Sequence, residues 1–235
     1  MASRYMTSTN SVQALIKRHQ GRFSTELGID LSEGNPREIF KWFLASVLFG
    51  ARITETIVKK TFRVFASRNV VSPKAILDTG WDGLVATLDE GGYVRYDFKT
   101  ATKLLDMCKA LTENYQADLT ILHDSAADPR DLEQRLKSLA KGIGEVTVNI
   151  FLREMRGVWK KADPLPSDMA VLAAKKMGLI PKDMTDKRKI LELLRDVWKK
   201  AGMRIKGFPD FEAALVRAGI ETRRKTQRIR RNART

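Results

Sequence analysis

Apolar residues recur three and four positions apart along most of the chain, a spacing that places them on one face of an α-helix. No segment alternates apolar and polar residues with the period of two that marks a half-buried strand. The pattern therefore predicts an all-α fold. A first short helix is expected to start near residue 10, and further helices are expected at 37–50, 54–65, 73–78, 81–89, 99–114, 129–139, 145–155, 169–177, 186–198 and 209–219.

The formal net charge of +15 and the pI near 10.0 favour a polyanionic partner, either nucleic acid or an anionic membrane. No apolar run is long enough to span a bilayer and no signal peptide begins the chain, so we expect a nucleic-acid partner and a cytoplasmic or nucleoid-associated protein. Seven Lys and Arg residues and no acid follow Glu221. We expect residues 222–235 to be a flexible basic tail that holds DNA through its phosphates, and the rest of the chain still carries +8.

Cysteine and histidine usage excludes several kinds of site. The single Cys108 excludes a disulfide framework and a four-cysteine iron–sulfur cluster, and its place in a periodic helix indicates a small core residue. His19 and His123 are far apart in sequence and no cysteine pair accompanies them, so no zinc spacing exists. We expect no metal held by side chains and no cofactor.

A turn with two glycines, Lys141-Gly142-Ile143-Gly144, precedes the helix expected from Glu145. Glycine accepts positive φ and lets another group approach the backbone closely, and the amides at a helix N-terminus attract phosphate. The turn is therefore a candidate phosphate-binding site. Downstream, Ser167 and Asp168 open another helix. Asp168 has the chemistry of a catalytic carboxylate, but its alternative role is to cap that helix, which Ser167 could do instead.

This order of motifs resembles the helix-hairpin-helix DNA glycosylases of the endonuclease III superfamily. The family pattern is a Leu, a Gly-hydrophobic-Gly hairpin, a Thr three residues later and an Asp that opens a later helix. The matching residues are Leu139, Gly142-Ile143-Gly144, Thr147 and Asp168. The resemblance implies two helical lobes with a DNA-binding cleft between them. Residues 36–156 would form a bundle that includes the hairpin, and residues 1–35 and 157–221 would form the lobe that carries the Asp helix.

The resemblance also implies which residues meet DNA. The hairpin amides would grip one strand, which gives a candidate set of Gly142, Ile143, Gly144, Val146 and Thr147. Arg52 stands at the turn from which relatives insert a polar side chain beside the extruded nucleotide; the alternative is an exposed loop arginine. In relatives the hairpin carbonyls often hold a monovalent cation, which leaves no signature in a sequence.

Three aromatic residues, Tyr93, Tyr96 and Phe98, follow the Gly91-Gly92 break. An extruded base is held against apolar or aromatic faces, so this cluster is a candidate pocket wall, with Tyr93 and Tyr96 as its members. The alternative, which we favour for at least two of the three rings, is packing between helices.

In the family, the Asp stabilises the electron-poor sugar and activates water, which is the role implied for Asp168. Members that also cut the strand use a lysine where this chain has Val146, so the resemblance implies a monofunctional enzyme. Lys141, Lys160 and Lys161 lie near this position in sequence, so the alternative that one of them supplies the nucleophilic amine stays open.

The sequence thus predicts a monomeric base-excision repair glycosylase. It would act on double-stranded DNA, flip a damaged or mispaired base and hydrolyse its N-glycosidic bond. Two alternatives stay open: a non-catalytic helix-hairpin-helix DNA-binding protein, and a bifunctional glycosylase and AP lyase that uses a displaced lysine.

Overall fold

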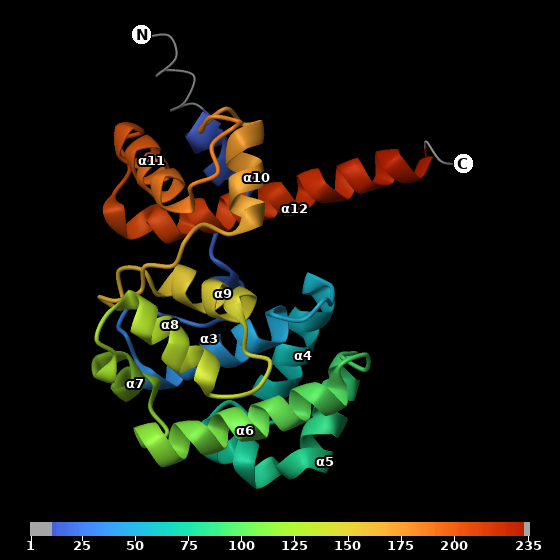
Figure 1. Ribbon diagram of the computed structural model, residues 1–235. Coiled ribbons are helices and arrows are strands. Elements are labelled where there is room, and N and C mark those ends of the chain that lie inside the picture. The colour runs from blue at the N-terminus through green and yellow to red at the C-terminus, as the bar shows by residue number, and fades with distance from the viewer. Residues whose placement is uncertain (1–10, 233–235) are drawn as a thin grey trace. The chain divides into compact units, whose positions relative to one another are not determined.

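A computed structural model describes residues 11–232, and within that range every regular element is helical (Figure 1). The prediction of an all-α fold is confirmed. Residues 11–18 are helical, and the elements that follow are α2 (Phe23–Glu26), α3 (Pro36–Phe49), α4 (Glu55–Ser67), α5 (Pro73–Gly91), α6 (Asp97–Tyr115), α7 (Leu119–Ser125), α8 (Pro129–Ser138), α9 (Glu145–Met155), α10 (Asp168–Lys176), α11 (Lys187–Lys200), a 3-10 turn (Ile205–Gly207) and α12 (Phe208–Asn232). None of these helices is long and apolar enough to cross a membrane.

Local chemistry explains where many helices begin. Asn35, Ser72 and Asp128 each accept a hydrogen bond from a backbone N–H of the first turn, and a proline follows each of them. Such a cap satisfies an amide that has no partner inside the helix, and proline fits the first helical position. Within α5, Gly80 has φ 68° and ψ 177°, so the backbone kinks between the two stretches for which the sequence predicts separate helices.

The C-terminal helix differs from its prediction. We expected it to end at Gly219, but α12 continues to Asn232, so residues 222–232 of the expected flexible tail are helical and residues 233–235 lie outside the described range. Gly219 is needed for close packing, because a Cβ there would overlap the carbonyl of Met169. Past it, Arg, Lys and Gln are good helix formers and continue the helix.

The described residues separate into two compact units. One unit is Ser24–Asp163, and α3 runs through its core. Phe43 packs edge-on against Phe151 of α9 with ring centroids 4.9 Å apart, and the Trp42 indole N–H donates to the Phe151 carbonyl at 3.1 Å. The middle of α3 is thereby fixed against α9 at Phe151.

The other unit joins the described residues up to Phe23 to those from Pro164 onwards. Here α10 packs on α12, and Trp198 of α11 stacks on Phe211 of α12 with ring centroids 5.3 Å apart. Arg217 ties the N-terminal segment to α12, because its guanidinium donates to the Gly21 carbonyl and lies 4.1 Å from the centroid of the Phe23 ring.

The boundaries of these units differ from the expected ones. Residues 24–35 and 157–163, which we assigned to the lobe formed by the termini, belong to the unit with α3 and α9. The Ser24 N–H donates to the buried carboxylate of Glu154 at 3.0 Å, and Gly34 lies against Val158. These contacts fix the segment to α9 and the residues after it.

Candidate functional site

The turn between α8 and α9 exposes its backbone. Gly142 has φ +91°, a conformation that side chains rarely adopt, and both Gly142 and Gly144 are exposed. Ile143 between them is buried, and its N–H donates to the Ala140 carbonyl at 3.1 Å. The buried isoleucine anchors the turn, so the backbone of both glycines faces solvent on a fixed support.

The first turn of α9 has no side-chain cap within the described part of the chain. Gly144 is the N-cap, and the first helical hydrogen bond runs from the Val148 N–H to its carbonyl at 3.1 Å. The amides that precede Val148 have no partner inside the helix, and Val146 beside them is 63% exposed. Such amides, together with the helix dipole, can receive a phosphate oxygen.

Thr147 does not face solvent. Its side chain is buried, and a Cβ on Gly50 would overlap its hydroxyl. Gly50 therefore lets the end of α3 approach α9 closely, and we assign the Thr147 side chain to this contact. The hydroxyl is enclosed, so a contact of Thr147 with DNA would have to come from its backbone, and that contact stays a prediction. The loop from Gly50 to Thr54 carries Arg52, which is exposed, so the structure brings the Arg52 loop next to the start of α9.

Lys103 of α6 lies beside the glycine turn. A Cβ on Gly142 would come 3.0 Å from Lys103 Cε and 3.4 Å from its Nζ. Burial lowers the pKa of Lys103, and among the described residues no carboxylate lies within ion-pair distance of it. Sequence reasoning missed this amine, because the helix packing that brings α6 to the turn leaves no local pattern.

Of the three lysines that we named, Lys161 has a structural role. Its amine donates to the carbonyls of His123 and Asp124, at 2.8 and 3.2 Å, where α7 ends. Lys141 and Lys160 are exposed. Lys161 thus satisfies helix-end carbonyls that lack partners inside α7.

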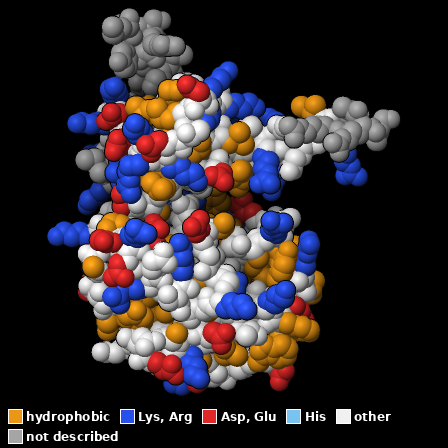
Figure 2. Space-filling model, in the orientation of Figure 1, with side chains coloured by type: hydrophobic (Ala, Val, Ile, Leu, Met, Phe, Trp, Pro, Cys, Tyr) orange, Lys and Arg blue, Asp and Glu red, His pale blue; other side chains and the backbone are white. Residues whose placement is uncertain are grey.

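The aromatic cluster separates into three environments. Tyr93 is fully buried, its hydroxyl donates to the Leu48 carbonyl at 2.6 Å and burial raises its pKa, so it has no ring face for a base. Tyr96 lies under the Arg95 guanidinium, 5.4 Å from its ring centroid. Phe98 is 58% exposed and lies 5.3 Å from the exposed Trp81 ring. Figure 2 shows hydrophobic side chains at the surface in the region of α5 and α6. Tyr93 is a core residue, and the pocket prediction for it is wrong.

In the other unit, Asp168 is the first residue of α10 but does not cap it. Ser167 is the N-cap, and its hydroxyl accepts the Ala170 N–H at 3.3 Å. The Asp168 side chain is 80% exposed and forms an ion pair with Lys187 Nζ at 2.7 Å. Because Ser167 performs the capping, the carboxylate of Asp168 is not required for the helix start.

Residues 11–232 contain no group of three His, Cys, Asp or Glu side chains that could hold a metal ion. A cation held by the hairpin carbonyls, as the resemblance implies, stays a prediction. In comparisons with known proteins, no family model and no curated protein matches this chain. The resemblance to helix-hairpin-helix glycosylases therefore depends on the residues described above.

Proposed function

We propose that this protein is a monofunctional DNA N-glycosylase that removes a damaged or mispaired base from double-stranded DNA. The observation that carries the proposal is the arrangement of Ser167 and Asp168. A carboxylate that a helix start does not need stands exposed at the position where the resemblance implies the catalytic aspartate. A protein that only binds DNA gains nothing from this acid, because negative charge weakens affinity for phosphates.

The chemistry follows from the bond to be broken. When the bond between the base and C1′ breaks, its electron pair leaves with the base, and the sugar becomes an oxocarbenium-like cation. The Asp168 carboxylate would stabilise that positive charge. Water then adds to C1′ and gives its proton to the carboxylate, which acts as a general base. The departing base takes up this proton, directly or through solvent, which restores the carboxylate. The products are the free base and an intact strand with an abasic site.

The glycine turn supplies the DNA contact in this proposal. The exposed amides at Gly142 and Gly144 and at the start of α9 would bind a strand phosphate without reading sequence. The Lys103 amine lies next to Gly142, where it can add a positive charge to the same phosphate. The net charge of +15, summed over the whole chain, supports a polyanionic partner.

Lys103 also supports a second candidate function. A lysine with a lowered pKa is a better nucleophile at neutral pH, and attack by Lys103 on C1′ of the abasic site would form a Schiff base and lead to strand cleavage. We favour the monofunctional reaction because Lys103 lies against the turn expected to hold a phosphate and Val146 cannot act as a nucleophile.

A panel of duplexes, each with one lesion or mismatch, tests the proposal. The full chain is incubated with each duplex, and the products are separated before and after alkali. We expect at least one duplex to break only after alkali, with no adduct trapped by borohydride. Binding to every duplex without base release would show a DNA-binding module instead. A borohydride adduct that disappears in Lys103→Gln would show the lyase.

A further inference from the structure

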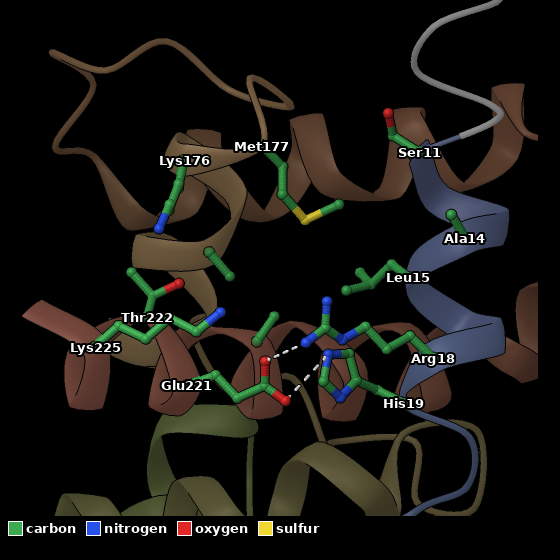
Figure 3. Close-up of a pocket in the computed structure, with 12 residues that line it drawn as sticks. Ser11, Ala14, Leu15, Arg18, His19, Lys176, Met177, Glu221, Thr222 and Lys225 are labelled. Atoms are coloured by element: carbon green, nitrogen blue, oxygen red, sulfur yellow. Dashed lines mark hydrogen bonds and ion pairs between the residues drawn. The ribbon is translucent and has the colours of Figure 1, made fainter.

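A cavity of about 460 Å³ lies within the unit formed by the terminal segments, between the helix at 11–18, α10 and α12 (Figure 3). Its volume is within the range of pockets that hold small molecules, roughly 300–1,000 Å³. The cavity lies at the C-terminal end of α10, whereas Asp168 begins that helix. It is therefore separate from the proposed catalytic carboxylate.

Small side chains on three helices leave this space open. Ala14 belongs to the N-terminal helix, Ala173 to α10 and Ala218 to α12, and all three line the cavity. Leu15 and Met177 add larger apolar surface, and Figure 3 shows them on either side of the open space. A cavity with this lining accepts an apolar group, because contact with it removes apolar surface from water.

The one acidic residue of the lining, Glu221, already has cationic and polar neighbours. Its Oε2 is 2.9 Å from Arg18 Nη2, and its Oε1 is 3.9 Å from His19 Nε2. Figure 3 shows Arg18 and His19 pointing at Glu221 from the N-terminal helix. The Arg18 charge offsets the charge of Glu221, so this acid does not neutralise the remaining cations of the cavity.

Those remaining cations are Lys176 and Lys225, which Figure 3 shows on the opposite side of the cavity from His19. No carboxylate among the described residues lies within ion-pair distance of either amine. Lys176 is not needed to complete the end of α10, since the Gly178 and Leu179 N–H groups donate to the last carbonyls of that helix, at 3.2 and 2.9 Å. Two positive charges are thus available at the edge of an apolar cavity.

We propose that this cavity binds a small organic anion with one acidic head group and an apolar body. Lys176 and Lys225 hold the head group, and Leu15 and Met177 contact the body. A duplex fits these features less well, because its phosphates have no apolar part to place among the alanines and Leu15. The inference does not depend on the proposed glycosylase function.

The probe for the test is 8-anilinonaphthalene-1-sulfonate, an aromatic sulfonate whose fluorescence rises in apolar surroundings. Titration of the full chain should show one saturable site. Lys176→Ala and Lys225→Ala should each weaken binding about three- to tenfold, the value of one ordinary hydrogen bond, because both lysines are exposed. Ala14→Leu should remove the site by filling it while leaving both lysines in place. Lys199→Ala, at an exposed position of α11, is the matched control and should bind as the parent does.

Circular dichroism identifies any variant that does not fold, and the two lysines are exposed enough for their variants to fold. Parent affinity for the probe in both lysine variants and in folded Ala14→Leu would overturn the proposal. Loss of duplex affinity in the lysine variants, with probe binding unchanged, would also overturn it and would assign this surface to DNA.

Discussion

At the start of α10, helix capping and the exposed carboxylate belong to two adjacent residues, although a single aspartate often provides both. Ser167 caps the helix, and Asp168 keeps its carboxylate in solvent, where only Lys187 pairs with it among the contacts described for residues 11–232. Both side chains of this ion pair are substantially exposed, and such pairs contribute at most about 1 kcal/mol. The carboxylate of Asp168 can therefore leave Lys187 for a substrate at little cost in stability.

If the glycine turn binds DNA as proposed, Lys103 should make the affinity for DNA depend on pH. Burial lowers its pKa below the ordinary 10.5, so the amine loses its proton and its attraction for phosphate at a lower pH than exposed lysines do. We expect duplex affinity to fall as the pH rises through this lowered pKa. Lys103→Arg, which stays charged, should remove that fall. Anisotropy titrations at fixed salt between pH 7 and the alkaline range measure the effect.

The matched control is Lys109→Gln, at an exposed position on the same helix. At neutral pH, Lys103→Gln should weaken binding and lower the salt slope by about 0.9, the value of one phosphate contact, and the control should do so less. Equal effects from the two glutamine variants, or a parent-like fall with pH in Lys103→Arg, would contradict a specific contact by Lys103.

Single residues could be predicted from the sequence where their role is local. Gly142, Gly144 and the Ser167–Asp168 pair form patterns within a few positions, and the turn and the helix start lie where those patterns put them. Lys103 could not be predicted, because the packing of α6 decides its place beside Gly142. The burial of Tyr93 has the same origin, since its partner, the Leu48 carbonyl, lies in α3.

At the scale of an element, the two glycines of the turn have different constraints. Gly142 requires positive φ, whereas Gly144 has φ −107° with open space where a Cβ would stand. Gly144→Val should therefore fold, with a melting temperature near that of the parent. Its side chain should cover the amides and weaken binding about tenfold or more, for damaged and undamaged duplex alike, as expected when a close backbone approach is blocked.

Gly144→Ser provides a graded comparison, since serine is a good N-cap residue with a smaller side chain. It should lower affinity less than valine does. Competition titrations with both duplexes give the measurement. Unchanged affinity in a folded Gly144→Val would show that the turn does not contact DNA.

The C-terminal half of α12 provides a separate prediction. Within the unit that contains it, α12 runs past α10 (Figure 1). Its C-terminal turns carry the exposed residues Arg223, Arg224, Arg228 and Arg231. Changing these four arginines to glutamine keeps a helix former at each position. We expect weaker binding to undamaged duplex and a less steep salt dependence, by about 0.9 in slope for each phosphate that the protein no longer neutralises.

The excision rate at saturating enzyme should stay unchanged in this variant, because we assign these charges to DNA binding and not to the reaction. Single-turnover assays and salt titrations on the same preparations give both values. A parent-like salt slope would show that α12 does not contact DNA.

Helices with long apolar periodicity could be predicted, with ends close to those observed. The seven-residue α7 could not, since its apolar positions are too few to establish a period and its start depends on a cap by Asp118. The end of α12 was missed for a different reason. A glycine in a sequence usually indicates a helix end, but Gly219 makes room for the Met169 carbonyl, which only packing reveals.

At the scale of the whole molecule, helical periodicity determines the fold class, and packing determines the division into two units. The segment 24–35 has no periodic apolar residues from which its unit could be predicted. A hydrogen bond from the Ser24 N–H to the buried Glu154 carboxylate joins it to the unit that contains α9. The proposed reaction needs a function from each unit, phosphate binding by the glycine turn and the carboxylate of Asp168. A variant of the glycine turn should therefore change DNA affinity, and a variant of Asp168 should change the excision rate.

The most direct test of the central claim is the single-turnover excision rate of Asp168→Asn on a duplex that the parent cleaves after alkali. Ser167→Ala is the matched control, because it removes the cap, at about 1 kcal/mol of stability, and leaves the carboxylate. We expect Asp168→Asn to bind the duplex as tightly as the parent or more tightly and to excise about 10² to 10⁴ times more slowly. Ser167→Ala should excise at close to the parent rate. Excision at the parent rate by Asp168→Asn would contradict the assignment of Asp168 as the catalytic carboxylate.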